Sequence, residues 1–184
     1  MSTELDGKRV AFLLANSGVE QVELTTPWAA VQAAGGRPTL IAPEAGTVQA
    51  FNNDVEPGDQ FTADVALSEA TATGYDALVL PGGTTNSDTL RTFPAASKLV
   101  KEFVAASKPI AAICHGPWTL VEADVVRGKT LTSWPSLQTD IRNAGGTWVD
   151  EEVFVCPTDG WTLVTSRKPD DLDAFSKALV DQFA

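Results

Sequence analysis

Short, unbroken apolar runs constrain the fold of this 184-residue chain more than any other feature of its sequence. Residues 10–14, 75–80 and 109–113 each contain Val, Ile, Leu or Ala in succession, which is typical of strands buried on both faces. Segments with helical spacing lie between these runs, at residues 20–34 and 94–107, and after them, at residues 118–123, 136–144 and 170–183. Strands that alternate with helices predict an α/β fold whose mostly parallel central sheet carries helices on both faces.

The rest of the sequence predicts further strands and one irregular region. Residues 38–42 and 129–133 are expected to be further strands, and residues 153–156 and 161–166 to be late strands that pair with each other. Residues 43–75 are expected to be irregular, with a turn at Pro57–Gly58 and a hairpin over residues 48–55. We predict a single domain over residues 1–184, with residues 1–8 as a flexible N-terminal extension.

The charge balance narrows the classes of partner. Thirteen basic residues face 24 acidic ones, giving a net charge of -11, which argues against binding to nucleic acid or to anionic membranes. No apolar stretch approaches the roughly 18 residues of a membrane span. Residues 1–9 include two acids, unlike a signal peptide, so we expect a cytoplasmic protein.

The counts of cysteine and histidine limit the metal chemistry. Cys114, Cys156 and His115 are the only such residues, too few for a thiolate and imidazole zinc site. We therefore expect free thiols, no metal and no cofactor. A carboxylate-rich Mg²⁺ or Ca²⁺ site stays open, although the chain has no EF-hand or P-loop motif.

Cys114 is the strongest candidate for a functional residue. Residues 112–117 read Ala-Ile-Cys-His-Gly-Pro, so a strand ends on Cys114 and a helix begins directly afterwards. Such an elbow exposes a nucleophile, and the helix N-terminus behind it predicts a lowered thiol pKa. The alternative is a buried cysteine that acts as a small apolar residue, which is our reading of Cys156.

Acid and base candidates surround this cysteine in the predicted topology. His115 is the candidate base, but adjacent side chains at such a turn often point apart, so the pair needs an orienting carboxylate, for which Asp88 is the candidate. Glu20 could keep its proton beside the sulfur and donate a hydrogen bond to it. The alternative for Asp88, Glu20 and especially Glu23 is an acid in the first turn of a helix.

Backbone and aromatic groups complete the predicted site. The N–H groups of Gly82, Gly83 and His115 are candidates for an oxyanion hole, against the alternative that Pro81–Gly83 is a simple turn. Trp118 and Trp134 could wall the pocket or pack in the core. All these segments follow strands, and the carboxyl ends of parallel strands meet at one sheet edge, where ligands bind.

Together these motifs resemble the PfpI family, the bacterial stress-protein branch of the superfamily that includes the Parkinson-linked deglycase. The resemblance covers residues 9–183 and rests on six segments: 19–24 (Val-Glu-Gln-Val-Glu-Leu), 78–83 (Leu-Val-Leu-Pro-Gly-Gly), 112–117, 132–135 (Thr-Ser-Trp-Pro), 143–150 and 165–172. It implies a three-layer, flavodoxin-like α/β/α sandwich and a homodimer or higher homo-oligomer.

The resemblance also implies roles for individual residues. Cys114 would be the nucleophile, Glu20 would hydrogen-bond its sulfur, and His115 would pair with an acid from a neighbouring subunit. The matching acid here is Asp88, an aspartate in a loop one residue longer than in the archaeal peptidases, which carry a glutamate. Glutamine amidotransferases of the superfamily need a second histidine, which this chain lacks.

Three functions follow from these expectations. The first is a cofactor-free glyoxalase or deglycase-type hydrolase acting on small carbonyl compounds or their adducts in stress protection. The second is an intracellular cysteine peptidase acting on peptides. The third is a redox sensor that responds through oxidation of Cys114.

Overall fold

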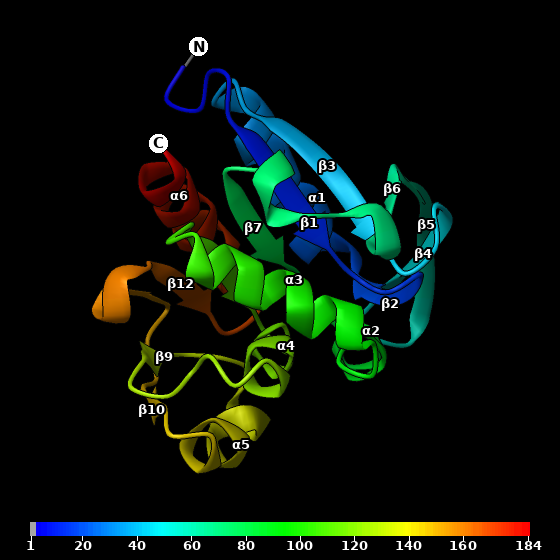
Figure 1. Ribbon diagram of the computed structural model, residues 1–184. Helices are drawn as coiled ribbons and strands as arrows, with labels where there is room; N and C mark the ends of the chain where they lie inside the picture. The colour runs from blue at the N-terminus through cyan, green and yellow to red at the C-terminus, as the bar shows by residue number, and fades with distance from the viewer. Residues whose placement is uncertain (1–2) are drawn as a thin grey trace.

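A seven-stranded sheet runs through the middle of the computed structural model, which describes residues 3–184 (Figure 1). Its strands, in spatial order, are β11 (Val153–Cys156), β12 (Leu163–Ser166), β8 (Ile110–Ile113), β7 (Ala77–Leu80), β1 (Arg9–Leu13), β3 (Arg37–Ala42) and β6 (Val65–Ala66). Neighbouring strands are parallel except for β11, which is antiparallel to β12. The predicted sheet and the predicted pairing of the two late strands are confirmed.

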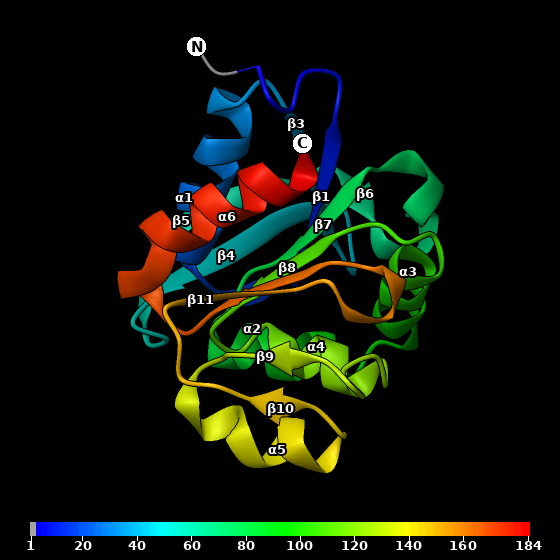
Figure 2. The ribbon, with the colours of Figure 1, turned by 90° about the vertical axis from the view of Figure 1, so that its left-hand side faces the viewer.

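Helices cover both faces of this sheet, as predicted (Figure 2). One face carries α1 (Gln21–Ala33) and α6 (Leu172–Phe183). The opposite face carries α2 (Thr84–Leu90), α3 (Pro94–Ala105), α4 (Pro117–Glu122) and α5 (Gln138–Asn143). None of the helices in the described part of the chain is long and apolar enough to cross a lipid bilayer.

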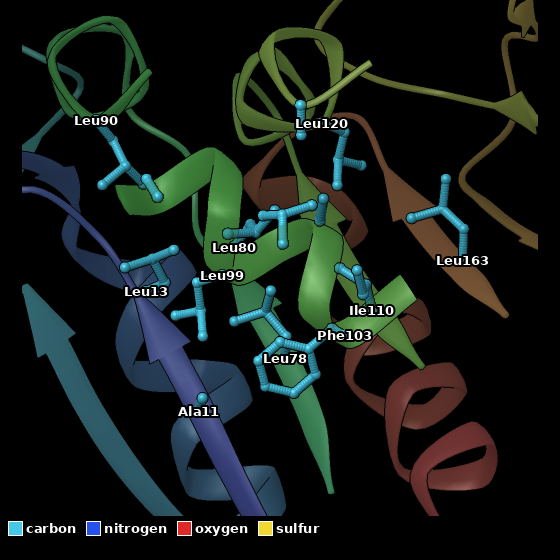
Figure 3. Close-up of a cluster of buried hydrophobic side chains, with 14 of the residues drawn as sticks. Ala11, Leu13, Leu78, Leu80, Leu90, Leu99, Phe103, Ile110, Leu120 and Leu163 are labelled. Atoms are coloured by element: carbon cyan, nitrogen blue, oxygen red, sulfur yellow. The ribbon is translucent and has the colours of Figure 1, made fainter. Parts of the chain in front are cut away.

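Alternation along the strands divides the core into two layers. In β1, Phe12 packs on the α1 and α6 side, whereas Ala11 and Leu13 face α3. Figure 3 shows Leu13 beside Leu99 of α3, and both side chains are almost fully buried. Each buried side chain of this size contributes about 1.5–3 kcal/mol, so the sheet is a rigid support for the loops at its edge.

A smaller sheet forms where the sequence predicted mostly irregular structure. It joins β2 (Ser17–Glu20), β4 (Gly46–Asn52) and β5 (Glu56–Ala63) in the order β2-β4-β5. The expected hairpin exists, but its turn is at residues 53–55, and Pro57 and Gly58 lie within β5. Asn53 and Asp54 adopt left-handed φ angles of 52° and 65°. A short sheet, β9 (Thr130–Leu131) with β10 (Thr147–Trp148), lies near α5.

The start of the chain also differs from the prediction of a flexible extension over residues 1–8. Leu5 is fully buried, and its N–H donates to the carbonyl oxygen of Ala34 at 2.9 Å. Residues 3–8 therefore pack against the end of α1, because Leu5 supplies an apolar side chain that fits there. The first two residues of the expected extension lie outside the described part.

Candidate functional site

The predicted elbow is present at the carboxyl end of β8. Cys114 follows Ile113 directly and has a φ of 61°, a left-handed conformation that strains any residue with a Cβ. The chain can turn here because Gly116 has no side chain: a Cβ at this position would collide with the carbonyl oxygens of Leu80 and Ile113. Helix α4 then begins at Pro117, whose missing N–H suits the first helical turn.

The Cys114 sulfur lies in a largely dry environment. The residue is 6% exposed, and burial raises the pKa of its thiol; charge on Glu23 raises it further. The backbone N–H groups of Gly83 and His115 are directed at the sulfur and oppose this rise. The prediction that the thiol pKa of Cys114 is lowered is therefore wrong for the folded chain without a ligand. Desolvation outweighs the field of α4, which is only six residues long.

The predicted oxyanion hole is assembled in part. The N–H groups of Gly83 and His115 face the sulfur, whereas the N–H of Gly82 is directed at Glu23 instead. A Cβ on Gly82 would collide with the Glu23 carboxylate and lie 2.6 Å from the Cβ of Cys114. Gly82 thus serves the site by making room, and two donors remain for a developing negative charge.

The carboxyl group beside the sulfur belongs to Glu23, not to the predicted Glu20. Glu23 is fully buried on α1, on the same helix face as Pro27 and Val31. Burial raises its pKa from 4.5 to about 8, the charges of nearby acids add to the rise, and the Cys114 thiol and the Gly82 N–H partly oppose it. No group in the described residues meets full hydrogen-bond geometry at either carboxyl oxygen. At neutral pH Glu23 is mostly protonated and presents an acidic proton to the sulfur.

Glu20 does not reach the Cys114 sulfur because its carboxylate binds the backbone of the β4–β5 turn. Its two carboxyl oxygens accept hydrogen bonds from the backbone N–H groups of Asn53 and Asp54, both at 3.0 Å. These are the two residues with left-handed φ angles at the β4–β5 turn. Glu20 therefore lines the site but binds the hairpin, and it forms no hydrogen bond with the sulfur.

His115 does contact its neighbour in sequence, against the expectation that the two side chains point apart. The His115 Nδ1 lies 3.2 Å from the Cys114 sulfur. Its Nε2 lies 3.4 Å from the Thr84 hydroxyl oxygen, and that hydroxyl donates to Asp54 at 2.8 Å. Burial lowers the pKa of His115, and the Asp54 charge opposes the shift. His115 is therefore neutral at physiological pH and able to accept a proton.

Asp88 does not supply the nearby acid within one chain. It is exposed on α2 and forms no hydrogen bond with His115 among the described residues. The carboxylate that approaches His115 is that of Asp54, which the sequence-based interpretation missed. An approach by Asp88 of the partner subunit stays a prediction, as does the expected homo-oligomer.

A cavity of about 560 Å³ opens above these groups. Its described lining consists of Glu20, Glu23, Asn53, Asp54, Gly83, Cys114, His115, Trp134, Lys168, Pro169 and Asp170. Lys168, paired with Asp170 at 3.1 Å, is the one lysine or arginine in this lining, and the sequence-based interpretation missed both Lys168 and Asp170.

The two predicted tryptophans have different roles. Trp134 forms a cavity wall and stacks on the His115 ring, with the ring centres 5.8 Å apart. Trp118 meets the same ring edge-on at 5.1 Å, lies outside the lining, and donates from its indole nitrogen to Asp140 at 2.8 Å. Trp118 therefore packs against the histidine outside the cavity, and of the two tryptophans Trp134 alone lines the space where a small molecule could bind.

Cys156 does not line this cavity and packs in the core. It is 3% exposed in β11, and its sulfur accepts a hydrogen bond from the Thr130 N–H at 3.4 Å. Within residues 3–184, no three His, Cys, Asp or Glu side chains are grouped so that they could hold a metal ion.

Comparison with known proteins gives this geometry a family context. The model of the DJ-1/PfpI family matches residues 8–182. The chain belongs to the DJ-1/PfpI family. A relative from Bacillus subtilis (strain 168), named "Putative cysteine protease YraA", is 37% identical over 170 residues, which cover 92% of this chain and 95% of the relative.

Solved structures of family members share the fold. Schizosaccharomyces pombe DJ-1 is 25% identical and superposes with a TM-score of 0.81, covering 96% of this chain and 92% of that one. Drosophila melanogaster DJ-1beta is 28% identical with a TM-score of 0.83, covering 100% and 91% of the two chains. The chain is thus similar to DJ-1 proteins over nearly its whole length, and the predicted family and fold class are confirmed.

Proposed function

We propose that this chain is a cysteine-dependent enzyme that acts without a cofactor on small reactive carbonyl compounds or their adducts. One observation carries the proposal: the sulfur of Cys114 lies at a cavity of about 560 Å³ and is contacted at 3.2 Å by an imidazole nitrogen able to take its proton. A cavity of this volume suits a small ligand held close to one nucleophile.

The residues supply a plausible order of events for an aldehyde or dicarbonyl substrate. His115 Nδ1 accepts the thiol proton as the sulfur attacks the carbonyl carbon. The carbonyl oxygen gains negative charge, which the Gly83 and His115 N–H groups can stabilise. Protonated Glu23 donates towards the sulfur and so keeps it from holding a full charge in a dry site. For methylglyoxal, the carbon bonded to sulfur then gives its proton to the neighbouring carbonyl carbon, and the new hydroxyl gives its proton to the neighbouring oxygen, which converts the hemithioacetal into a thioester of lactate. One water cleaves the C–S bond of this thioester, which releases lactate and returns the Cys114 thiol without an external oxidant or reductant.

The other two functions have less support. The name of the B. subtilis relative favours a peptidase, and the same nucleophile would serve it. The redox-sensor function needs an accessible thiolate, whereas Cys114 is 6% exposed and burial raises its thiol pKa.

A substrate test separates these possibilities. Wild type and Cys114→Ala are compared for methylglyoxal consumption and lactate formation, with Cys156→Ala as the control because that thiol lies outside the site. We expect loss of turnover in Cys114→Ala alone. Equal turnover in all three proteins would refute the proposal. Cleavage of casein or a fluorogenic peptide that depends on Cys114, without methylglyoxal turnover, would favour the peptidase.

A further inference from the structure

Thr84 lies between a carboxylate and the imidazole of the site. Asp54 Oδ1 accepts the Thr84 backbone N–H at 2.8 Å, and Asp54 Oδ2 accepts the Thr84 hydroxyl at 2.8 Å. The same hydroxyl oxygen lies 3.4 Å from His115 Nε2, and His115 Nδ1 lies 3.2 Å from the Cys114 sulfur. Four side chains from three separate segments thus form one continuous chain of polar contacts.

The donors and acceptors in this chain have only one consistent assignment when Asp54 is ionised. A carboxylate can only accept, so the single hydroxyl proton of Thr84 is directed at Asp54. The Thr84 oxygen can then only accept from His115, which requires a proton on Nε2. A neutral imidazole carries one proton, so Nδ1 is bare, and this is the nitrogen that faces the thiol.

Glu20 holds the Asp54 end of this chain in place. Its carboxyl oxygens bind the N–H groups of Asn53 and Asp54 at 3.0 Å. Both residues have left-handed φ angles, which such a turn keeps only when surrounding contacts support them. Glu20 therefore acts on the site through the hairpin turn, which explains its position in the cavity lining without contact to the sulfur.

We propose that Asp54 and Thr84 are positioning residues that hold His115 in the Nε2–H tautomer, so that its bare Nδ1 takes the proton of Cys114. The proposal rests on the proposed function only in naming Cys114 as the nucleophile. When the thiol proton moves to Nδ1, the electron pair of the S–H bond stays on sulfur and the imidazole becomes a cation. Asp54 then stabilises that cation through Thr84. The other titratable side chains that share the cavity with His115, besides Cys114 and Asp54, are Glu20, Glu23, Lys168 and Asp170.

His115 is the only histidine of the chain, so nuclear magnetic resonance can observe it without assignment ambiguity. In ¹⁵N-labelled protein, long-range proton–nitrogen spectra identify which ring nitrogen carries the proton, and a pH titration gives the pKa. Neither measurement requires a substrate. A failure of the proposed function would therefore leave this test intact.

Asp54→Asn is the decisive variant. The asparagine oxygen can still accept the Thr84 N–H, but its amide then donates to the Thr84 hydroxyl, which turns its own proton towards His115. We expect His115 to shift to the Nδ1–H tautomer, its pKa to fall, and any turnover to decrease on the order of 10²–10⁴-fold. Asp59→Asn is the matched control, because it removes one charge from the same hairpin at a residue bonded to Gln21.

Variants of Thr84 test the bridge itself. Thr84→Val removes the hydroxyl, and we expect a mixture of tautomers, whereas Thr84→Ser keeps the hydroxyl and should retain the Nε2–H tautomer. An unchanged tautomer and pKa in folded Asp54→Asn would overturn the proposal. So would a change of tautomer in Asp88→Asn with none in Asp54→Asn, since the orienting acid would then be Asp88 of the partner subunit.

Discussion

Replacing Glu23 by glutamine should stabilise the protein and abolish a pH dependence of its folding. Glu23 is fully buried, and its pKa rises from 4.5 to about 8 on folding. The folded state therefore binds a proton that the unfolded chain has already released between these two pH values. Because the unfolded state binds fewer protons there, stability falls as pH rises through this window.

The size of the effect follows from the same two values. Each pH unit between 4.5 and about 8 lowers the free energy of unfolding by about 1.4 kcal/mol, which amounts to on the order of 5 kcal/mol above pH 8. By pH 7 the loss is about 3 kcal/mol. Glutamine keeps the shape and carries no charge, so Glu23→Gln escapes this loss.

Urea unfolding of wild type and Glu23→Gln between pH 5 and pH 8.5 measures the difference. We expect the free energy of unfolding of the variant to rise steadily relative to that of wild type, by roughly 2.5 kcal/mol between pH 5 and 7. Glu44→Gln, at an exposed position, is the control for removing one carboxylate. Parallel curves for wild type and Glu23→Gln would refute the reasoning, because Glu23 would then titrate alike in both states.

Two further predictions concern the immediate surroundings of the sulfur. Gly82→Ala should lower turnover at least tenfold while circular dichroism stays native, because the new Cβ would displace the Glu23 carboxylate and lies 2.6 Å from the Cβ of Cys114; wild-type rates would contradict this. Iodoacetamide at pH 7 should modify Cys114 more slowly than free cysteine, as followed by peptide mass spectrometry, because burial raises the pKa of the thiol. Faster modification would instead indicate an activated thiolate.

The layered fold and the elbow could be predicted from local sequence patterns. Apolar runs such as residues 109–113 must be buried on both faces, and a cysteine that ends such a run before a helix lies at the sheet edge whatever the rest of the chain does. Both statements depend on segments of about ten residues. The structure bears them out in β8, Cys114 and α4.

The choice between Glu20 and Glu23 could not be made in this way. The two acids are three residues apart, and which one turns inward depends on where β2 ends and α1 begins. Sequence patterns place such boundaries only to within a few residues. The i, i+4, i+8 spacing of Glu23 with Pro27 and Val31 is the one signal that could have identified the buried acid.

Asp54 had no local signal at all. It lies 30 residues before Thr84, and the two meet only because the small sheet places the β4–β5 turn over the end of the large one. Lys168 reaches the same cavity from the segment between β12 and α6. Contacts of this kind arise from the packing of two sheets, which no pattern within either segment encodes.

The costs to stability at this site are concentrated on two of the groups that we propose take part in the chemistry. The left-handed φ of 61° at Cys114 costs on the order of 1–3 kcal/mol of stability. Burial of the ionised Glu23 carboxyl group costs more than this. The neighbouring strands β7 and β8 are fully buried, and their burial can offset both costs. If these costs had no role in function, a substitution that removes one of them would make the protein more stable and leave its activity unchanged. If Glu23→Gln is more stable but slower, the burial of that carboxyl is part of the mechanism, because the same dry contact that destabilises the charge keeps a proton beside the sulfur.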